Sequence, residues 1–239
     1  MAEIQAILFD VFGTVVDWRG SLIRDLGAWG AARGLRVDWP GLVDAWRGAY
    51  LPSMNRVRRG ELPWMNLDAL HAQSLAELGP RFGLPALDEA ACAYIVQGWH
   101  RLTPWPDSVA GLARLRARFT IGTLSNGNVA LLVGMAKRAG LPWDMVFSAE
   151  LFRHYKPDAE VYLGACALLG LPPGAVMLAA AHNSDLAAAR RCGLRTAFIA
   201  RPGEYGPGQS LDLSAEGDWD FVAADIGALA DMMTAPGAP

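Results

Sequence analysis

Short apolar runs of strand length recur along the chain and alternate with longer segments that have helix-like patterns. Between successive runs there is room for a crossover helix, which is typical of a parallel sheet flanked by helices. The hydrophobic pattern therefore predicts an α/β fold built on a parallel sheet. The expected strands span residues 4–10, 119–125, 144–149, 175–181 and 195–200.

One long stretch breaks this alternation. Residues 19–102 contain four helix-like patterns and no convincing strand, so we expect a helical insertion after the first strand. The two prolines of "TPWPDS" (103–108) stiffen the exit from the insertion, and the residues that follow can begin a helix. We therefore expect a core of residues 1–15 and 104–239 and a helical cap of residues 16–103.

The composition is that of a globular chain with a large core: 52% of the 239 residues are hydrophobic, 19% are charged, and the net charge is −3. The basic residues are scattered apart from Arg56, Arg58 and Arg59, which argues against a nucleic-acid or membrane partner. No leader pattern and no membrane-spanning run is recognisable. Three widely spaced cysteines suit reduced thiols, so we expect a cytoplasmic protein. The tail "TAPGAP" (234–239) is expected to be disordered.

The first apolar run ends on an acid, within "AILFDVFGTVVDW". Ligands of parallel α/β sheets bind outside the carboxyl ends of the strands, so Asp10 is a candidate site residue. A carboxylate at the end of a buried strand is costly unless amides or a cation hold its charge. We therefore expect a loop whose backbone amides point at Asp10, with Gly13 allowing a tight turn and Thr14 supplying a hydroxyl. Taken alone, Asp10 could equally be a turn cap.

Three further strand ends carry "LSNGN", "HYKPDAEVY" and "AAHNSDLAAARRCG". They place Ser125, Lys156 and Asp185 in this order along the chain. Together with Asp10 in "DVFGT", this ordered set resembles the haloacid dehalogenase superfamily over essentially the whole chain. The resemblance implies a Rossmann-like parallel sheet with a helical cap domain inserted after the first strand. It also implies that Asp10 is a carboxylate nucleophile.

The residue two positions after Asp10 separates reaction classes within this superfamily. Phosphatases of the superfamily resemble one another in having an aspartate there, which protonates the leaving alkoxide, whereas this chain has Phe12. A phenyl ring has no proton to give, and in "AAAHNSD" only Asp185 offers a carboxylate for magnesium. A halide leaving group needs no proton. The chain thus resembles the 2-haloacid dehalogenase branch, which has an aromatic residue at this position and uses no metal or other cofactor.

This resemblance implies a role for each matched residue. Asp10 attacks the carbon that carries the halogen of a small 2-haloalkanoic acid, and water then hydrolyses the aspartyl ester to release a 2-hydroxy acid. Lys156 pairs with Asp10 and Asp185 and opposes the rise in the Asp10 pKa that burial would cause. The implied site residues are Asp10, Lys156, Asp185 and Thr14 for catalysis, Val11, Phe12, Ser125, Tyr162 and His182 around the substrate, and Arg47 and Asn126 for the halide.

Several of these matches leave a second interpretation open. Ser125 could also cap the helix that follows it, and Tyr162 could simply pack on the sheet. Arg47 is a lone arginine on an amphipathic helix, where it could lie on a solvated face. The fourth motif resembles the Ser-Ser-Asn-x-x-Asp pattern of many haloacid dehalogenases, but His182 stands in place of its asparagine. It is either a donor or acceptor at the site or a satisfied loop histidine.

Two other functions are alternatives to the dehalogenase reaction. A magnesium-dependent phosphatase or phosphonate hydrolase would need other acids near Asp10 or a Schiff-base lysine in the insertion, yet residues 19–102 contain no lysine. A catalytically idle binding protein would not need Ser125, Lys156 and Asp185 together with Asp10. The expected partners are a haloacid and water, with a homodimer implied by resemblance alone. The sequence leaves open which haloacid is used and whether fluoride can leave.

Overall fold

The computed structural model describes residues 3–235 and separates into two compact units. One unit contains the residues up to Asp17 and those from Thr103 onward, and the other spans Trp18–Leu102. The sequence had placed the junctions at 15/16 and 103/104. The small difference arises because β2 (Val16–Asp17) pairs with β3 (Thr103–Pro104) as a short antiparallel ladder, so both junction strands belong to the first unit.

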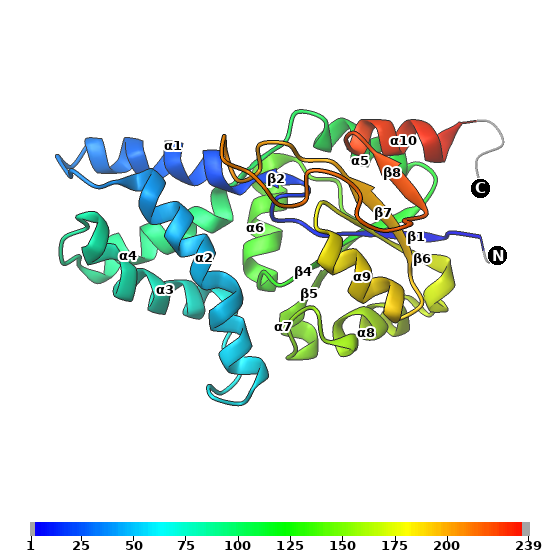
Figure 1. The fold of residues 1–239 in the computed structure, drawn as a ribbon, viewed down its shortest axis with the longest axis horizontal. Coiled ribbons are helices and arrows are strands. Elements are labelled where there is room, and N and C mark those ends of the chain that lie inside the picture. The colour runs from blue at the N-terminus through cyan, green and yellow to red at the C-terminus, as the bar shows by residue number, and fades with distance from the viewer. Residues whose placement is uncertain (1–2, 236–239) are drawn as a thin grey trace. The chain divides into compact units, whose positions relative to one another are not determined.

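A six-stranded sheet forms the centre of the first unit (Figure 1). Its order is β5-β4-β1-β6-β7-β8, and every neighbouring pair is parallel. Five strands were predicted from the apolar runs, whereas β8 was missed because it is short and its middle residue, Val222, is 49% exposed. The strands are β1 (Ala6–Phe9), β4 (Thr120–Ser125), β5 (Met145–Ser148), β6 (Val176–Ala180), β7 (Arg195–Ile199) and β8 (Phe221–Ala223).

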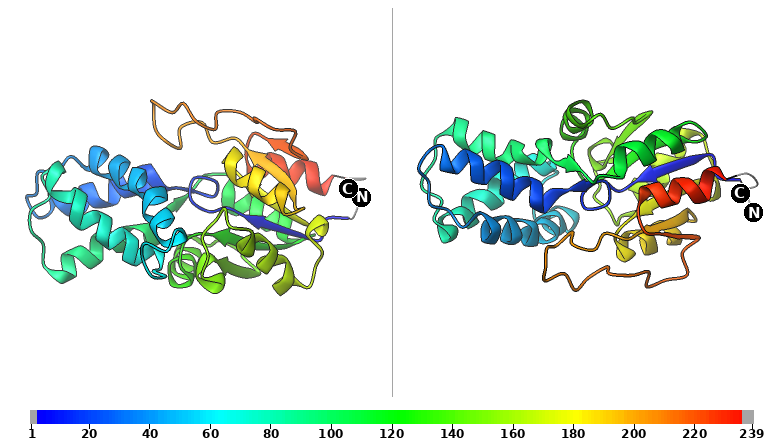
Figure 2. Two further views of the ribbon diagram at one scale, coloured as in Figure 1. Left: turned by 60° about the horizontal axis from the view of Figure 1, so that its bottom comes forward. Right: turned by 90° about the horizontal axis from the view of Figure 1, so that it is seen from above.

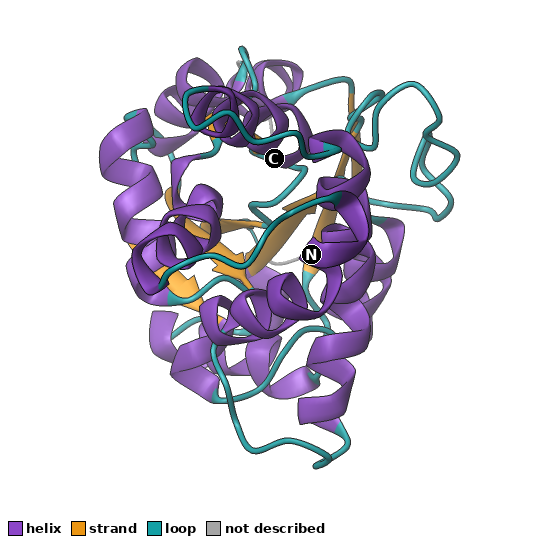
Figure 3. Ribbon diagram, turned by 90° about the vertical axis from the view of Figure 1, so that its left-hand side faces the viewer, coloured by secondary structure: helices purple, strands orange, loops and turns teal. Residues whose placement is uncertain are grey.

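Helices cover the two faces of this sheet (Figure 3). Crossovers in parallel sheets are right-handed, so the connections leading outward from β1 to β5 and those leading to β6 and β7 lie on opposite faces. Accordingly α5 packs against α10, and α8 packs against α9. The helices are α5 (Ser108–Arg116), α6 (Val129–Ala139), α7 (Ala149–Phe152), α8 (Ala159–Leu169), α9 (Asn183–Arg191) and α10 (Ile226–Thr234), with a 3-10 turn at Pro173–Ala175.

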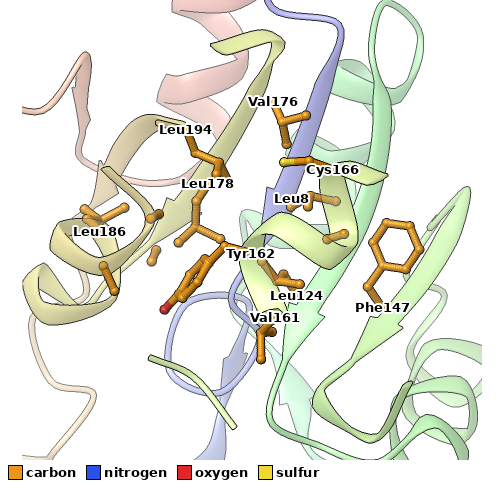
Figure 4. Packing of buried hydrophobic residues seen from close by; sticks show 14 of the residues in the cluster. Leu8, Leu124, Phe147, Val161, Tyr162, Cys166, Val176, Leu178, Leu186 and Leu194 are labelled. Carbon is orange, nitrogen blue, oxygen red and sulfur yellow. The ribbon is translucent and has the colours of Figure 1, made fainter. Parts of the chain in front are cut away.

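The core beneath α8 and α9 explains why the strands read as continuous apolar runs. Both faces of the sheet are covered, so all residues of β1 and β6 are buried rather than every second one. Figure 4 shows the α8 side of this core, where the Tyr162 ring lies among aliphatic side chains. Its members include Leu8, Leu124, Phe147, Val161, Cys166, Val176, Leu178, Leu186 and Leu194.

The second unit is helical, as predicted for the insertion. Its helices are α1 (Trp18–Ala31), α2 (Trp39–Arg58), α3 (Leu67–Leu78) and α4 (Glu89–Val96), with 3-10 turns at Gly79–Phe82 and Gln97–Arg101. Asp38, Asn66 and Asp88 each accept a hydrogen bond from the amide three residues later, which caps α2, α3 and α4. Buried Trp18, Trp46 and Trp99 provide much of its apolar volume.

Three remaining sequence expectations concern the chain as a whole. All three cysteines are free thiols; Cys166 is buried, and Cys92 and Cys192 are half-buried. Over residues 3–235, the structure has no helix with the length and apolar character needed to cross a membrane. Of the tail expected to be disordered, Thr234 ends α10, and residues 236–239 lie outside the described residues.

Candidate active site

The loop after β1 makes a tight turn that brings Thr14 back toward Asp10. Gly13 has a φ of +87°, which a residue with a side chain rarely adopts, and its amide donates to the carbonyl of Val16 at 3.0 Å. The carbonyl of Val11 accepts from the amides of Val15 and Val16. These three amides therefore form hydrogen bonds within the turn itself. The Thr14 hydroxyl donates to Oδ2 of Asp10 at 2.9 Å.

This use of the amides corrects one expectation. Among the described residues, the groups that contact the Asp10 carboxylate are the side chains of Thr14, Lys156 and His182, not backbone amides. The amide of Asp10 itself extends the sheet by donating to the carbonyl of Ala179 at 3.0 Å. Asp10 is only 7% exposed, so side-chain donors from three separate parts of the chain replace the lost hydration of its charge.

Lys156 links two buried carboxylates. Its Nζ atom donates to Oδ1 of Asp10 at 3.0 Å and to Oδ2 of Asp185 at 2.5 Å, the pairing that the family resemblance implied. Its backbone amide donates to Oδ1 of Asn126 at 2.8 Å, which ties the loop before α8 to the loop after β4. The Lys156 side chain is 7% exposed, so both ion pairs are shielded from solvent.

Tyr162 completes the surroundings of Asp185. It extends from α8, and its hydroxyl donates to Oδ1 of Asp185 at 2.6 Å, while Asp185 lies in the first turn of α9. The sequence left open whether Tyr162 packs on the sheet or lies at the site. Both descriptions apply, because its ring is buried in the core and its hydroxyl reaches a site carboxylate.

The Lys156 ammonium lies where a magnesium ion that bridges the two carboxylates of this site would bind. Each of the four oxygens of Asp10 and Asp185 already accepts a side-chain hydrogen bond, and the Lys156 ammonium lies between the two groups. A divalent cation bound to both carboxylates at once would have to displace that ammonium. Within residues 3–235 there is also no cluster of three His, Cys, Asp or Glu side chains arranged to hold a metal.

The ion pairs shift the pKa values of both partners. Burial raises the pKa of Asp10, but the charges and hydrogen bonds of Lys156 and His182 outweigh it and hold this pKa well below its ordinary value. Burial lowers the pKa of Lys156, but Asp10 and Asp185 raise it above its ordinary value. At neutral pH the site therefore holds an ionised carboxylate beside a charged ammonium, as a carboxylate nucleophile requires.

His182 connects Asp10 to a carboxylate that the sequence reasoning missed. Its Nδ1 atom lies 3.2 Å from Oδ2 of Asp10, and its Nε2 atom lies 3.1 Å from both oxygens of Glu204. Glu204 is 1% exposed and lies in the long loop after β7, which Figure 2 shows in orange. The sequence signal for this loop is the polar segment that follows the apolar run 195–200, in "FIARPGEYG", since it too leaves the carboxyl end of a strand.

The remaining residues that the sequence predicts to bind the substrate lie on two adjoining loops of the first unit. Phe12 is 2% exposed, and its ring packs so closely on Gly127 that a Cβ atom there would lie 3.1 Å from it. The hydroxyl of Ser125 accepts from the amide of Gly127 at 3.2 Å, and Val11 is buried beside Asp10. The loops after β1 and β4 are therefore in direct contact, and the roles of these residues in substrate binding stay predictions.

Arg47 belongs to the helical unit. Its guanidinium lies over the ring of Tyr50, 4.4 Å from the ring centroid, and 5.3 Å from that of Trp18. This stacking holds the planar group in a defined orientation, unlike an arginine that is free in solvent. Its predicted role in halide binding stays a prediction.

Comparison with known proteins now assigns the class. The family model described as haloacid dehalogenase-like hydrolase matches residues 4–193, which include β1, the helical insertion and the four predicted site loops. The chain belongs to this family of hydrolases. The parallel sheet, the inserted helical unit and the Asp10–Lys156–Asp185 arrangement agree with that assignment.

Three of the matching proteins are named as 2-haloacid dehalogenases. The solved structure of the L-2-haloacid dehalogenase PA0810 is 58% identical, with a TM-score of 0.92 over 95% of this chain and 97% of that one. The defluorinating L-2-haloacid dehalogenase Rha0230 is 46% identical, with a TM-score of 0.94 over 97% and 96%. The (S)-2-haloacid dehalogenase 1 of Pseudomonas sp. (strain CBS-3) is 30% identical over 86% of this chain and 89% of its own.

Proposed function

We propose that this chain is a 2-haloacid dehalogenase that hydrolyses small (S)-2-haloalkanoic acids to 2-hydroxy acids through an ester on Asp10. The observation that carries the proposal is the buried Asp10 carboxylate, which Lys156 and His182 keep ionised. The buried ring of Phe12 stands at the position where phosphatases of this superfamily have a proton-donating aspartate. The relatives named above, which span nearly the same length, carry the matching activity in their names.

The first chemical step is an in-line displacement. An oxygen of Asp10 bonds to the carbon that carries the halogen, the carbon–halogen bond breaks, and the halide leaves with its electron pair. The substrate carbon inverts. Lys156 keeps Asp10 ionised, and Asp185 and Tyr162 hold Lys156 in place. We further propose that Ser125 and the loop of Val11 and Phe12 bind the substrate carboxylate.

The second step returns the enzyme to its starting state. Water attacks the carboxyl carbon of Asp10 in the ester, and the bond between that carbon and the oxygen attached to the substrate breaks. The product is a 2-hydroxy acid, and Asp10 is released as a carboxylate. Overall, one water and one haloacid anion give one hydroxy acid anion, one halide and one proton.

Halide release in the presence of EDTA tests this proposal, with chloroacetate, both enantiomers of 2-chloropropionate and fluoroacetate as substrates. We expect metal-independent chloride release that prefers the (S) enantiomer and yields (R)-lactate. Asp10→Asn should abolish it, whereas Asp231→Asn, at an exposed ion pair with Arg114, should not. Phosphate release from p-nitrophenyl phosphate with magnesium, without halide release from any haloacid, would favour the phosphatase alternative instead.

Fluoroacetate is included because one relative with 46% identity is named as defluorinating. A carbon–fluorine bond demands more stabilisation of the leaving group, so its turnover would show how strongly this site holds a halide.

We also propose a cytoplasmic location and, by resemblance, a homodimer with no nucleic-acid or membrane partner. Sedimentation of the purified protein tests the oligomeric state.

A further inference from the structure

The two oxygens of Asp10 have different partners. Oδ2 lies 2.9 Å from the Thr14 hydroxyl and 3.2 Å from Nδ1 of His182. Oδ1 accepts from Lys156 at 3.0 Å. Oδ2 thus faces a hydrogen-bond donor and an ion-pair partner, whereas Oδ1 faces a single donor and keeps a lone pair in the carboxylate plane for a substrate. In the proposed dehalogenation Oδ1 is therefore the attacking atom, and Oδ2 becomes the carbonyl oxygen of the ester.

Each of the two groups that face Oδ2 is held by a second contact. The Thr14 hydroxyl oxygen accepts from the amide of Ala181 at 2.8 Å, so its own proton is directed at Asp10. His182 lies between two carboxylates, with Nδ1 facing Asp10 and Nε2 facing Glu204. An imidazole with an acceptor at each nitrogen satisfies both contacts only when both nitrogens carry a proton.

We propose that Thr14 and protonated His182 form the site that stabilises the oxyanion during hydrolysis of the Asp10 ester, and that Glu204 is the positioning residue that keeps His182 protonated. The proposal rests on the dehalogenase function proposed above. It assigns a role to Glu204, which lies outside the four motifs of the family resemblance. It also gives His182 a charge that an asparagine at this position would lack.

The charge balance shows why Glu204 is needed in the second step. When the ester forms, Asp10 becomes neutral, and His182 loses one of its two anionic partners. Glu204 then remains as the carboxylate that faces the imidazolium, with Lys156 on the far oxygen of Asp10. Burial lowers the pKa of His182, but Glu204 and Asp10 together raise it well above its ordinary value. Without Glu204, the buried imidazole would lose its proton at the ester stage.

The imidazolium acts on the step in which charge develops at Oδ2. The water oxygen bonds to Cγ of Asp10, and the electron pair of the C=O bond moves onto Oδ2, which accepts from Thr14 and His182. The bond from Cγ to Oδ1 then breaks, the departing alkoxide takes one water proton, and the other is released as the Asp10 carboxylate reforms. Because the interaction with His182 strengthens from neutral ester to oxyanion, it lowers the barrier to hydrolysis.

Glu204→Gln tests this role, because it keeps the shape of the side chain and removes its charge. Mixed rapidly with excess (S)-2-chloropropionate, this variant should release one equivalent of chloride in a fast burst, followed by turnover slowed about tenfold to a hundredfold. Mass spectrometry should show the accumulated ester on the peptide that contains Asp10. The alkaline limb of kcat should also move to lower pH. Glu216→Gln, at an exposed position in the same loop, should behave as wild type.

A second variant keeps the test decisive if Glu204→Gln does not fold. His182→Asn retains an uncharged donor beside Asp10, so it should also accumulate the ester, and its alkaline limb should disappear. Wild-type burst, turnover and pH profile in the folded variants would overturn the inference and leave the dehalogenase function intact. Loss of the chloride burst without ester would also overturn it, because the pair would then act before hydrolysis. Wild-type protein that releases no halide would overturn the proposed function, and this inference with it.

Discussion

The ammonium group of Lys156 lies 3.0 Å from Oδ1 of Asp10, although 146 positions separate the two residues along the chain. Asp10 follows the central strand β1, and Lys156 follows the edge strand β5 and the short helix α7. Parallel strands bring their carboxyl ends to one edge of the sheet, so these loops meet there. The pair keeps Asp10 ionised, and Asp185 and Tyr162 extend it into a buried network.

Lys156→Met should destabilise the protein and change its pH profile. The substitution leaves two buried carboxylates without their shared cation, which costs about 3–5 kcal/mol in the free energy of unfolding. Without the ammonium the pKa of Asp10 rises, so the acid limb of kcat/KM should move to higher pH. Urea unfolding and a pH–rate profile measure both effects. Lys137→Met, at an exposed position on α6, is the control, and an unchanged acid limb in Lys156→Met would contradict the prediction.

Tyr162→Phe should lower activity more than substrate affinity. It removes the hydroxyl that donates to Asp185 at 2.6 Å, a hydrogen bond to a charged group worth about 1.5–3 kcal/mol of stability. Asp185 then holds Lys156 less rigidly, so we expect kcat to fall about tenfold, or about 1.4 kcal/mol, with little change in KM. Tyr94→Phe is the matched control, because its hydroxyl lies 3.4 Å from Asp25 in the helical unit. Equal kinetic effects in the two variants would exclude this role.

Gly13→Ala should cost more stability than Gly140→Ala. Both glycines have positive φ, +87° and +69°, so each substitution carries a backbone penalty of about 1–2 kcal/mol. A Cβ atom at Gly140 meets nothing within 4 Å, whereas at Gly13 it would lie 2.1 Å from Oε1 of Glu204. Only Gly13→Ala should therefore displace Glu204 and slow ester hydrolysis. Equal unfolding free energies and equal turnover for the two variants would show that Glu204 does not approach this turn.

Arg47→Lys should reduce halide release about a hundredfold if the predicted halide role is right, because lysine keeps the charge but lacks the planar donor group. The control is Arg33→Lys in the same helical unit. The Arg33 guanidinium lies 4.4 Å from the ring centroid of Trp29, the same distance that separates Arg47 from Tyr50. Both substitutions remove a guanidinium stacked on an aromatic ring, so an effect of lost stacking would appear in both variants. Steady-state chloride release measures the difference, and similar activities would assign Arg47 a packing role.

The free energy of unfolding should have its maximum between about pH 4 and pH 6.5. The folded-state pKa of Asp10 is depressed, so its contribution is present above its ordinary value of 3.8 and is lost as the pH falls below it. The folded-state pKa of His182 is raised, so its contribution is complete below 6.5 and is lost as the pH rises toward the folded value. Urea unfolding across this range measures both sides. In His182→Asn the decline attributed to His182 on the alkaline side should be absent.

Much of the fold was predictable because its signals are local. The continuous apolar runs of β1, β4 and β6 reflect burial on both faces of a parallel sheet, and any short window of sequence contains that information. The helical insertion was recognisable for the same reason. The three-residue strand β8 was not, because its half-exposed pattern differs little from that of a loop.

The chemistry at the strand ends can be read from the sequence alone: Asp10, Lys156 and Asp185 in order, and Phe12 in place of an acid. How these side chains contact one another follows only from the folded chain. In the part of the chain that the structure describes, side chains and not loop amides hold the charge of Asp10. Glu204 is brought against His182 by a loop more than twenty residues further along the chain. Such contacts depend on how the loops fold over one edge of the sheet, and no periodicity in the sequence encodes that approach.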